Sequence, residues 1–338
     1  MKNSRTTITD VAKLAGVSIS TVSVVVNNKD KYISPELRKK VQDAVTALNY
    51  QPNLIARSLK LQMTKSIGLI VTNITSPVIP PLVRTVQKIA QQKGFDTFIV
   101  SSEENQKIQN DAIRSMLSKR VDGLIICPTI SNDNSVLLNA IDTIPVVVIE
   151  RHTQNANFVT TNNKDTAYKI AKHLIEHGYQ RIGMIAMQVF GSNTRDRIEG
   201  YKQALLENQM LIPDLIRETD YVGLSAFETA KDLITTQNVD AIMTASQSIT
   251  LGTYMAIMSL NLKIPDNIAI FGYDDLPWME AVSPSISTTH QPIEELAQKA
   301  CDILFCKLEN SDEVVRSHCL ETELIIRESC GCGEKSLN

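Results

Sequence analysis

The sequence predicts a small all-α head followed by a larger, two-lobed α/β body with parallel sheets. Three observations support this fold class. The first 50 residues hold short amphipathic segments separated by glycine and serine, which is typical of short helices. After Ser66, short runs rich in Val and Ile alternate with longer amphipathic stretches, as in a parallel sheet covered on both faces. This alternation starts again after Thr161, and 338 residues are enough for two or three domains.

The first helix of the head is expected to begin at Thr9, whose hydroxyl would cap it. Val11, Leu14 and Ala15 recur at helical spacing and are predicted to form its apolar side. Gly16 is expected to end the helix, because glycine enters the left-handed region without a Cβ penalty.

Two further helices are expected in the head. Ser18 would cap the second helix, with Val22 and Val25 turned inward. Ser34-Pro35-Glu36 supplies a cap, a proline at the first helical position and an acid near the positive helix end. The third helix would bury Leu37, Val41, Ala44, Val45 and Leu48. Three short helices with a glycine turn after the first indicate a helix-turn-helix module, whose second helix enters the DNA major groove.

The charge distribution agrees with a DNA-binding head. Residues 1–60 contain ten Lys and Arg against four Asp and Glu, a net charge of +6; because the whole chain carries −3, the remainder carries −9. A basic end on an acidic body is typical of a protein that binds a polyanion at that end. The alternative is a helical bundle with ordinary surface lysines.

Two segments of the head resemble a known family. TITDVAKLAGVSISTVS and YISPELRKKVQDAVTALNYQPNLIARSL are similar to the head of the lactose/galactose repressor family, and the similarity continues to about Ser329. The resemblance implies a helix-turn-helix domain over residues 1–50, a hinge over 51–65 and an effector-binding and dimerisation body over 66–338. It also implies a homodimer that binds near-palindromic double-stranded operator DNA, without a cofactor.

Candidate DNA contacts lie mainly on the second helix. Where the family usually reads TVSRV, this chain reads TVSVV, and the missing arginine is commonly a guanine or phosphate contact. By helical position the base-reading candidates are Ile19, Ser20 and Val24, two of which are apolar and suit thymine methyl groups. Ser18, Thr21, Ser23 and Asn27 would position the DNA backbone, and Thr9 is a further DNA-binding candidate.

The hinge contains about two helical turns over Asn53–Lys60, which are marginal alone because helix nucleation is costly. A flexible linker is therefore the alternative. The resemblance implies that two copies of this segment fold in the DNA minor groove, where Leu59 wedges into the central base step. Ala56 would then allow the two helices to approach closely, and Asn53 and Arg57 would lie near the DNA.

The body is predicted to consist of alternating strands and helices. Strands are expected over residues 66–72, 95–100, 123–127, 145–149, 157–161, 181–187, 239–245 and 268–272. Helices are expected over residues 83–94, 110–120, 165–178, 199–209 and 251–261. The resemblance implies a body similar to periplasmic sugar-binding proteins, with lobe one at 66–161 and 293–319 and lobe two at 162–292 and 320–330. The chain would cross between lobes near Thr161–Asn163, His290–Pro292 and Cys319–Leu320.

Ligands of such sheets bind at the carboxyl ends of strands, here between the lobes. The effector candidates are Ile74, Ser76, Glu150, Arg151, Arg197, Ser246, Gln247, Asp274 and Trp278. Arg197 and Asp274 match the family's pattern best, with a surface salt bridge and a helix cap as the alternatives. Trp278 would either stack on a ligand or fill the second lobe. Two arginines would suit a carboxylate or phosphate on the effector, so a sugar or a sugar-acid-like metabolite is expected.

Other classes of protein and site are disfavoured. No apolar run approaches the ~18 residues of a transmembrane helix, and no signal peptide is evident, so a cytoplasmic protein without membrane contact is expected. Six scattered cysteines are expected to be reduced. Cys330-Gly331-Cys332 lacks a second ligand pair, and His173 and His177 are expected to flank an exposed helix end, so no metal site is predicted.

No phosphate-binding loop and no pairing of nucleophile and base is evident, so the chain is not expected to be an enzyme. The predicted function is a sequence-specific DNA-binding transcriptional regulator, a repressor whose operator affinity is set by a small metabolite. Two alternatives stay open: control by a protein co-regulator, and a solute-binding protein without gene regulation.

Overall fold

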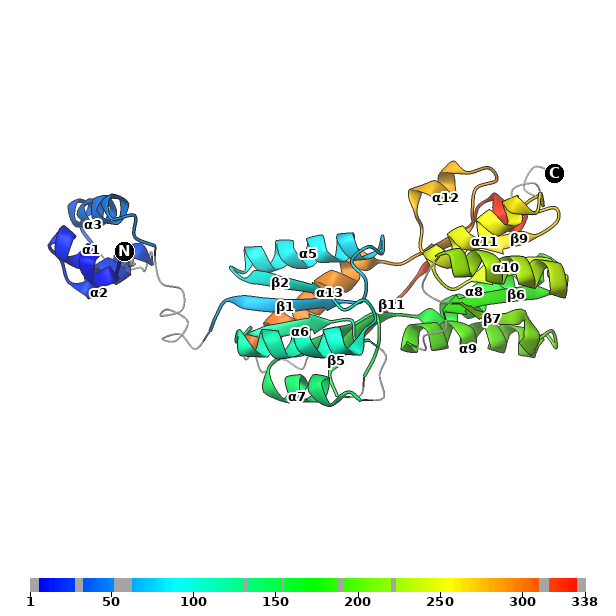
Figure 1. The fold of residues 1–338 in the computed structure, drawn as a ribbon, viewed down its shortest axis with the longest axis horizontal. Coiled ribbons are helices and arrows are strands. Elements are labelled where there is room, and N and C mark those ends of the chain that lie inside the picture. Colours follow the sequence, from blue (N-terminus) through cyan, green and yellow to red (C-terminus); the bar gives the residue numbers. More distant parts are fainter. Residues whose placement is uncertain are drawn as a thin grey trace. The chain divides into compact units, whose positions relative to one another are not determined.

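The computed structural model describes residues 6–27, 33–51, 63–129, 133–153, 155–187, 191–219, 223–309 and 316–332. The chain divides into two compact units, Met1–Thr64 and Lys65–Asn338, which we call the head and the body. Figure 1 labels their elements. The predicted fold class, an all-α head with a two-lobed α/β body and parallel sheets, is confirmed.

The head consists of α1 (Ile8–Ala15), α2 (Ile19–Val26) and α3 (Pro35–Ala47). The bend between α1 and α2 is 105°, which is typical of a helix-turn-helix. Its buried core comprises Val11, Ala12, Val22, Val25, Val41 and Ala44. Leu37, Val45 and Leu48 of the predicted stripe are only partly buried.

The cap of α1 differs from the prediction. Thr7, not Thr9, is the N-cap, and it forms a reciprocal capping box with Asp10. The Thr7 hydroxyl donates to the Asp10 carboxylate over 2.7 Å and the Thr7 N–H donates to it over 2.8 Å, and these bonds hold the pKa of Asp10 below its usual value. Leu14 is also placed wrongly by the prediction: it is 56% exposed, because α2 and α3 cover the side of α1 that carries Ala12.

The other predicted ends in the head are confirmed. Gly16 has φ +66°, in the left-handed region that favours glycine. The Ser18 hydroxyl accepts from the Thr21 N–H over 3.1 Å, and the Ser34 hydroxyl caps α3 in the same way. Pro35 stands at the start of α3, where no backbone N–H is needed.

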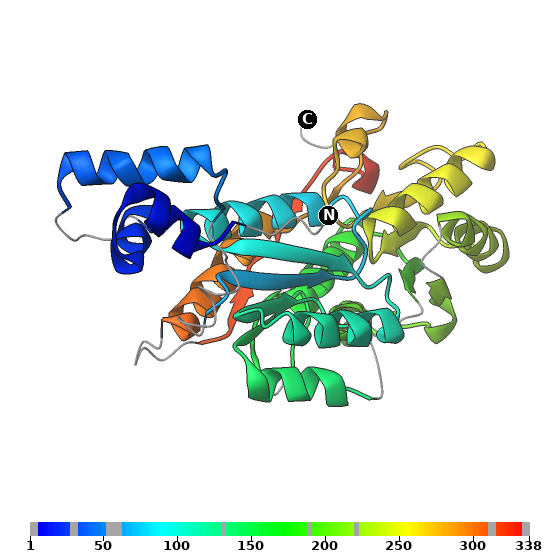
Figure 2. The same ribbon diagram turned by 60° about the vertical axis from the view of Figure 1, so that its left-hand side comes forward.

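The first lobe of the body is a six-stranded parallel sheet in the order β11-β5-β4-β3-β1-β2. Helices α5 and α13 cover one face, and α6 and α7 cover the other (Figures 1 and 2). Its elements are β1 (Ser66–Val71), α5 (Ile79–Gln92), β2 (Asp96–Ser101), α6 (Gln106–Ser118), β3 (Gly123–Ile126), α7 (Ser135–Thr143), β4 (Val146–Ile149), β5 (Asn157–Thr161), α13 (Ile293–Leu308) and β11 (His318–Leu320).

The second lobe is a four-stranded parallel sheet in the order β7-β6-β8-β9. Helices α8 and α9 pack on one face, and α10 and α11 pack on the other. Its elements are α8 (Asn163–Glu176), β6 (Ile182–Met187), α9 (Ser192–Glu207), η1 (Pro213–Leu215), β7 (Ile216–Thr219), α10 (Gly223–Gln237), β8 (Ala241–Thr244), α11 (Gln247–Ser259), β9 (Ala269–Phe271), α12 (Pro277–Ala281) and η2 (Glu328–Cys330).

Three segments connect the lobes and are joined to one another. The second and third of them in chain order contain β10 (Thr288–His290) and β12 (Glu323–Ile325), which pair antiparallel. Asn162 Oδ1 accepts from the Thr322 N–H over 3.0 Å, and the Thr161 hydroxyl donates to Gln291 over 2.9 Å. Strand β11 continues to Leu320, so the third connection begins just after the expected 319–320 junction. Because hydrogen bonds link these segments, we expect a movement of one segment to displace the other two.

Within the described residues, no single helix is long and apolar enough to span a membrane. The pair α1 and α2 reaches the required length and composition only together, across its bend. These two helices pack with α3 around the core of the head.

Candidate functional site

The exposed start of α2 presents a cluster of hydroxyl groups. The Ser18 hydroxyl lies 2.7 Å from that of Ser20 and 2.8 Å from that of Thr21. Ile19 stands among them and is 48% exposed, although it is a large apolar residue. These bonds between hydroxyls lie within one turn, so they can be exchanged for bonds to DNA phosphates or bases at small cost.

The predicted contacts farther along α2 are partly covered. Asn27 donates to the Ser23 carbonyl over 2.7 Å and closes the helix end, and Val24 is half-buried. Thr9 is exposed on α1. The four hinge candidates lie outside the described residues, so their predicted roles stay predictions: Asn53, Ala56, Arg57 and Leu59.

A polar cleft lies between the two lobes of the body, and most predicted effector residues line it. The predicted residues that the structure brings together there are Ser76, Glu150, Arg151, Arg197, Ser246, Gln247 and Asp274. Lining residues that the sequence reading missed are Thr72, Val78, Ile79, Glu104, Met187, Asn193, Thr194, Ala245, Ser248 and Gln291. Several of these lie near strand ends, but only the fold shows which of them face the cleft.

Arg197 is buried in the second-lobe wall of the cleft, in α9. Its Nε donates to Asn163 Oδ1 over 2.7 Å, and its Nη1 donates to the Ala245 carbonyl over 2.6 Å. The guanidinium carbon stacks 3.6 Å from the centre of the Tyr273 ring. The alternative of a surface salt bridge is therefore wrong, because the side chain is only 7% exposed and is held by neutral acceptors.

Asp274 follows β9 with φ +65°, an uncommon conformation for a residue other than glycine. Its carboxylate accepts from Gln291 Nε2 over 2.5 Å, and its N–H donates to the Thr289 hydroxyl over 3.2 Å. Burial raises the pKa of this carboxyl above its ordinary value. Gln291 lies in a connection between the lobes, so the hydrogen bond joins Asp274 directly to that connection.

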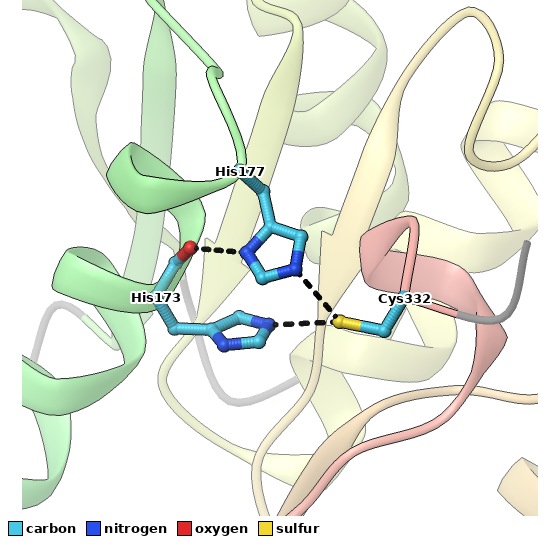
Figure 3. Close-up of side chains that lie close together, drawn as sticks. All are labelled: His173, His177 and Cys332. Atoms are coloured by element: carbon cyan, nitrogen blue, oxygen red, sulfur yellow. Dashed lines mark hydrogen bonds between the residues drawn. The ribbon is translucent and has the colours of Figure 1, made fainter. Parts of the chain in front are cut away.

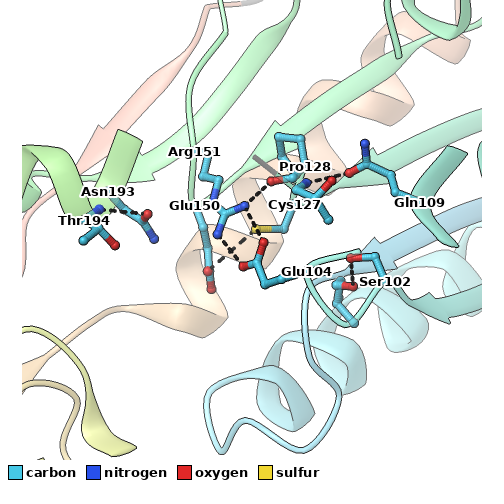
Figure 4. A network of polar contacts seen from close by, with 11 residues as sticks. Ser102, Glu104, Gln109, Cys127, Pro128, Glu150, Arg151, Asn193 and Thr194 are labelled. Atoms are coloured by element: carbon cyan, nitrogen blue, oxygen red, sulfur yellow. Dashed lines mark hydrogen bonds and ion pairs between the residues drawn. The ribbon is translucent and has the colours of Figure 1, made fainter. Parts of the chain in front are cut away.

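Arg151 forms a buried ion pair on the first-lobe wall. Its Nη2 lies 2.5 Å from Glu104 Oε1, its Nη1 lies 3.1 Å from Oε2, and Nη1 also donates to the Pro128 carbonyl (Figure 4). Such a two-pronged pair is a strong, directional contact. The charge of Arg151 is therefore already matched within the protein.

Glu150 precedes Arg151 and has φ +60°. Its Oε2 accepts weakly from the Cys127 thiol over 3.9 Å, while its Oε1 is buried without a hydrogen-bond partner. Arg151 Nε is also buried without a partner. Burial, followed by the nearby negative charge of Asp274, raises the pKa of Glu150.

Two effector predictions do not agree with the structure. Ile74 is 47% exposed and does not line the cleft, because its loop turns toward solvent and its N–H is held by the Ser101 hydroxyl. Trp278 packs on the apolar core beneath α10 and α11, 5.9 Å from the Tyr254 ring. Of its two expected roles, filling the second lobe is the one observed.

Comparison with known proteins gives matches over nearly the whole chain. Residues 7–53 match the family of bacterial regulatory proteins of the lacI family. Residues 64–328 match the periplasmic binding proteins and sugar binding domain of the LacI family.

Similar proteins include HTH-type transcriptional repressors PurR. That of Haemophilus influenzae strain PittEE is 32% identical over 330 residues, covering 96% of this chain and 98% of the relative. That of Actinobacillus pleuropneumoniae serotype 3 is 34% identical over 331 residues, with the same coverage.

Two solved structures share the whole architecture. The Lac repressor dimer bound to operator and the anti-inducer ONPF has a TM-score of 0.85 at 25% identity, covering 97% of this chain and 99% of that one. The transcriptional regulator CelR–cellobiose complex has a TM-score of 0.72 at 25% identity, covering 96% and 100%. The chain therefore belongs to the LacI family, as a DNA-binding transcriptional repressor controlled by a small-molecule effector.

Proposed function

We propose that the effector is a small, uncharged molecule rich in hydroxyl groups, a sugar or a close relative, which binds in the cleft of the body. The proposal also assigns base contacts to Ile19, Ser20 and Val24 of α2. In this account a homodimer reads a near-palindromic operator through two heads, and the effector sets the affinity.

The unpartnered atoms of the cleft carry the effector proposal. Glu150 Oε1 is a buried acceptor without a donor, and Arg151 Nε is a buried donor without an acceptor. Leaving such groups unsatisfied costs ~1–3 kcal/mol each. A hydroxyl group both donates and accepts, so one or two hydroxyls of a ligand would satisfy both atoms.

The charges of the cleft favour a neutral ligand over a sugar acid. The sequence offers Arg151 and Arg197 as a pair for an anion, but Arg151 is matched by Glu104. Arg197 faces Glu150 and Asp274, two carboxyls whose charges act on each other across the cleft. An anionic group placed here would meet more carboxylates than unmatched cations, and burying it would be costly.

Contact with both lobes gives the ligand a means to change DNA affinity. Glu150 belongs to the first lobe, whereas Asp274 and Arg197 belong to the second. Gln291, which bonds Asp274, lies in a connection between the lobes. A ligand that prefers one closure angle shifts the balance between the two states by its differential affinity, typically ~1–3 kcal/mol.

Calorimetric titration of the intact protein with neutral sugars and matching sugar acids tests the effector class. We expect binding from the neutral set and at least ~10-fold weaker binding of Asp274→Ala, since a bond to a charged group contributes ~1.5–3 kcal/mol. Trp278→Phe is the control outside the cleft and is expected to bind normally. Tight binding of sugar acids only would reject the neutral ligand.

A further inference from the structure

Three side chains outside the cleft converge at the end of the second lobe (Figure 3). They are His173 from the last turn of α8, His177 at the C-cap of that helix, and Cys332 from the tail after η2. The ligand atoms of all three lie within 4.8 Å of one another. Cys332 Sγ is 3.0 Å from His177 Nε2 and 3.5 Å from His173 Nε2.

The prediction that His173 and His177 flank an exposed helix end is wrong. Both rings are half-buried, and they stack with centroids 4.2 Å apart. Residues four apart in a helix share one face, so both imidazoles point the same way. The tail that follows η2 supplies Cys332 against that face, although it is 155 residues from His177 in sequence.

Cys330 brings a further sulfur next to Cys332 and His173. Its Sγ lies 3.2 Å from Cys332 Sγ and 3.3 Å from His173 Nε2. The same sulfur accepts from the Ser287 hydroxyl over 3.1 Å, and the residue is fully buried. The ligand pair that seemed absent from the sequence is therefore supplied by α8.

The backbone between the two cysteines is built for this arrangement. Gly331 has φ +84°, a conformation that L side chains rarely adopt. A Cβ there would lie 2.9 Å from Tyr179 Oη, and this hydroxyl donates to the Cys330 carbonyl over 3.3 Å. A side chain at 331 would be strained by this φ and would meet the Tyr179 hydroxyl.

The His177 ring is oriented as metal-binding imidazoles are. His177 Nδ1 lies 2.8 Å from the His173 carbonyl, so it carries the proton and leaves the Nε2 lone pair facing Cys332.

We propose that His173, His177, Cys330 and Cys332 form a structural zinc site that fastens the C-terminal tail to α8. Two imidazole nitrogens and two sulfurs are a donor set that suits tetrahedral Zn²⁺. Binding would release the two thiol protons to solvent, because the thiolates are the ligands. The proposed ion takes no part in chemistry and stabilises the second lobe.

Cobalt titration of the full-length protein, reduced and stripped of metal, tests the site. We expect one Co²⁺ per chain, with sulfur-to-cobalt charge-transfer absorption and the strong visible bands of tetrahedral geometry, and its displacement by Zn²⁺. Cys332→Ser and His177→Gln should weaken metal binding by more than ~10-fold. Loss of a residue that only supports a metal ligand already weakens metal binding by about that much, so loss of a ligand itself should cost more. Cys319→Ser, which removes an exposed cysteine of the first lobe, is the matched control and should bind normally.

Thermal unfolding supplies a second readout that is independent of spectroscopy. Zinc should raise the Tm of the wild type and of Cys319→Ser but not that of Cys332→Ser, because only a ligand of the folded state stabilises it. Circular dichroism before titration checks that each variant is folded. The proposal is overturned if the reduced wild type binds no metal, if Cys332→Ser binds equally well, or if Cys330 and Cys332 form a disulfide whose presence alone sets the Tm.

Discussion

The polar groups of α2 and those of the cleft are satisfied in opposite ways. At the start of α2, the exposed Ser18 and Ser20 and the half-buried Thr21 have hydroxyls that bond to one another within one turn. In the cleft, Arg197 and Asp274 are buried. Arg197 bonds to Asn163 of α8, and Asp274 bonds to Gln291 in a connection between the lobes. The hydrogen bonds of the first surface join residues within one turn, whereas those of the cleft join residues that are far apart in sequence.

This difference matches the two kinds of partner. A surface whose bonds are local can exchange them for DNA without disturbing the fold. The hydrogen bonds of the cleft reach into the connections between the lobes, so a changed contact in the cleft also affects those connections. The head is therefore suited to binding DNA, and the cleft is suited to passing the effect of a bound ligand on to the connections between the lobes.

Deleting residues 1–64 should have the largest effect, because it removes the whole DNA-binding unit and leaves the body, a compact unit with hydrophobic clusters in both of its lobes. We expect specific DNA binding to disappear and effector binding to be unchanged, measured by fluorescence anisotropy and calorimetry. If the truncated body still bound operator DNA specifically, the division of roles between head and body would be wrong.

Arg197→Met should have the next largest effect. It leaves Asn163 and the Ala245 carbonyl without their donor and leaves Asp274 and Glu150 without the nearby cation. Removing one partner of a buried charged network costs ~3–5 kcal/mol, so chemical denaturation should show a body destabilised by about 3 kcal/mol. Arg195→Met, an exposed neighbour on α9, is the control; equal losses in both variants would place Arg197 outside any network.

Glu150→Gln should give a smaller effect that depends on pH. Because burial raises the pKa of Glu150, its contribution to stability is complete below the ordinary carboxyl value of 4.5 and is lost as pH rises through the raised folded value. The variant should therefore gain stability over the wild type as pH rises, followed by Tm across a pH series. The exposed Glu280→Gln should show no such trend, and a flat difference for Glu150→Gln would contradict the burial of its charge.

Thr7→Ala should have the smallest effect, confined to the head. Losing the capping box of α1 should cost about 1 kcal/mol of head stability. Thr9→Ala is the matched control, because Thr9 lies inside the helix and caps nothing. Chemical denaturation of the isolated head measures the stability of the two variants. An equal loss of stability in both would contradict the assignment of Thr7 as the N-cap.

The sequence predicts a feature well where its cause lies within a few residues. Gly16 and Ser34 end or begin helices through contacts inside one turn, and both predictions are confirmed. The predicted start of α5 at residue 83 is later than the observed start at Ile79, because Pro80 and Pro81 fit the first helical turn, where a backbone N–H is not needed.

Features that depend on distant packing could not be predicted. Glu104 enters the cleft because it meets Arg151, 47 residues away, and no local pattern announces this pair. Trp278 follows Asp274 closely in sequence, yet the turn into α12 directs it to the core. The pairing of Cys332 with His177 likewise depends on where the tail folds back.

Selecting DNA from a random duplex pool with the intact protein, and then titrating the winners by anisotropy, tests the central claim most directly. The account predicts a near-palindromic site with two half-sites, an affinity that falls steeply with salt, and a change of ~5–150-fold when a neutral sugar-like effector is added. Enrichment of no sequence over random duplex at moderate salt, with and without small molecules, would contradict it.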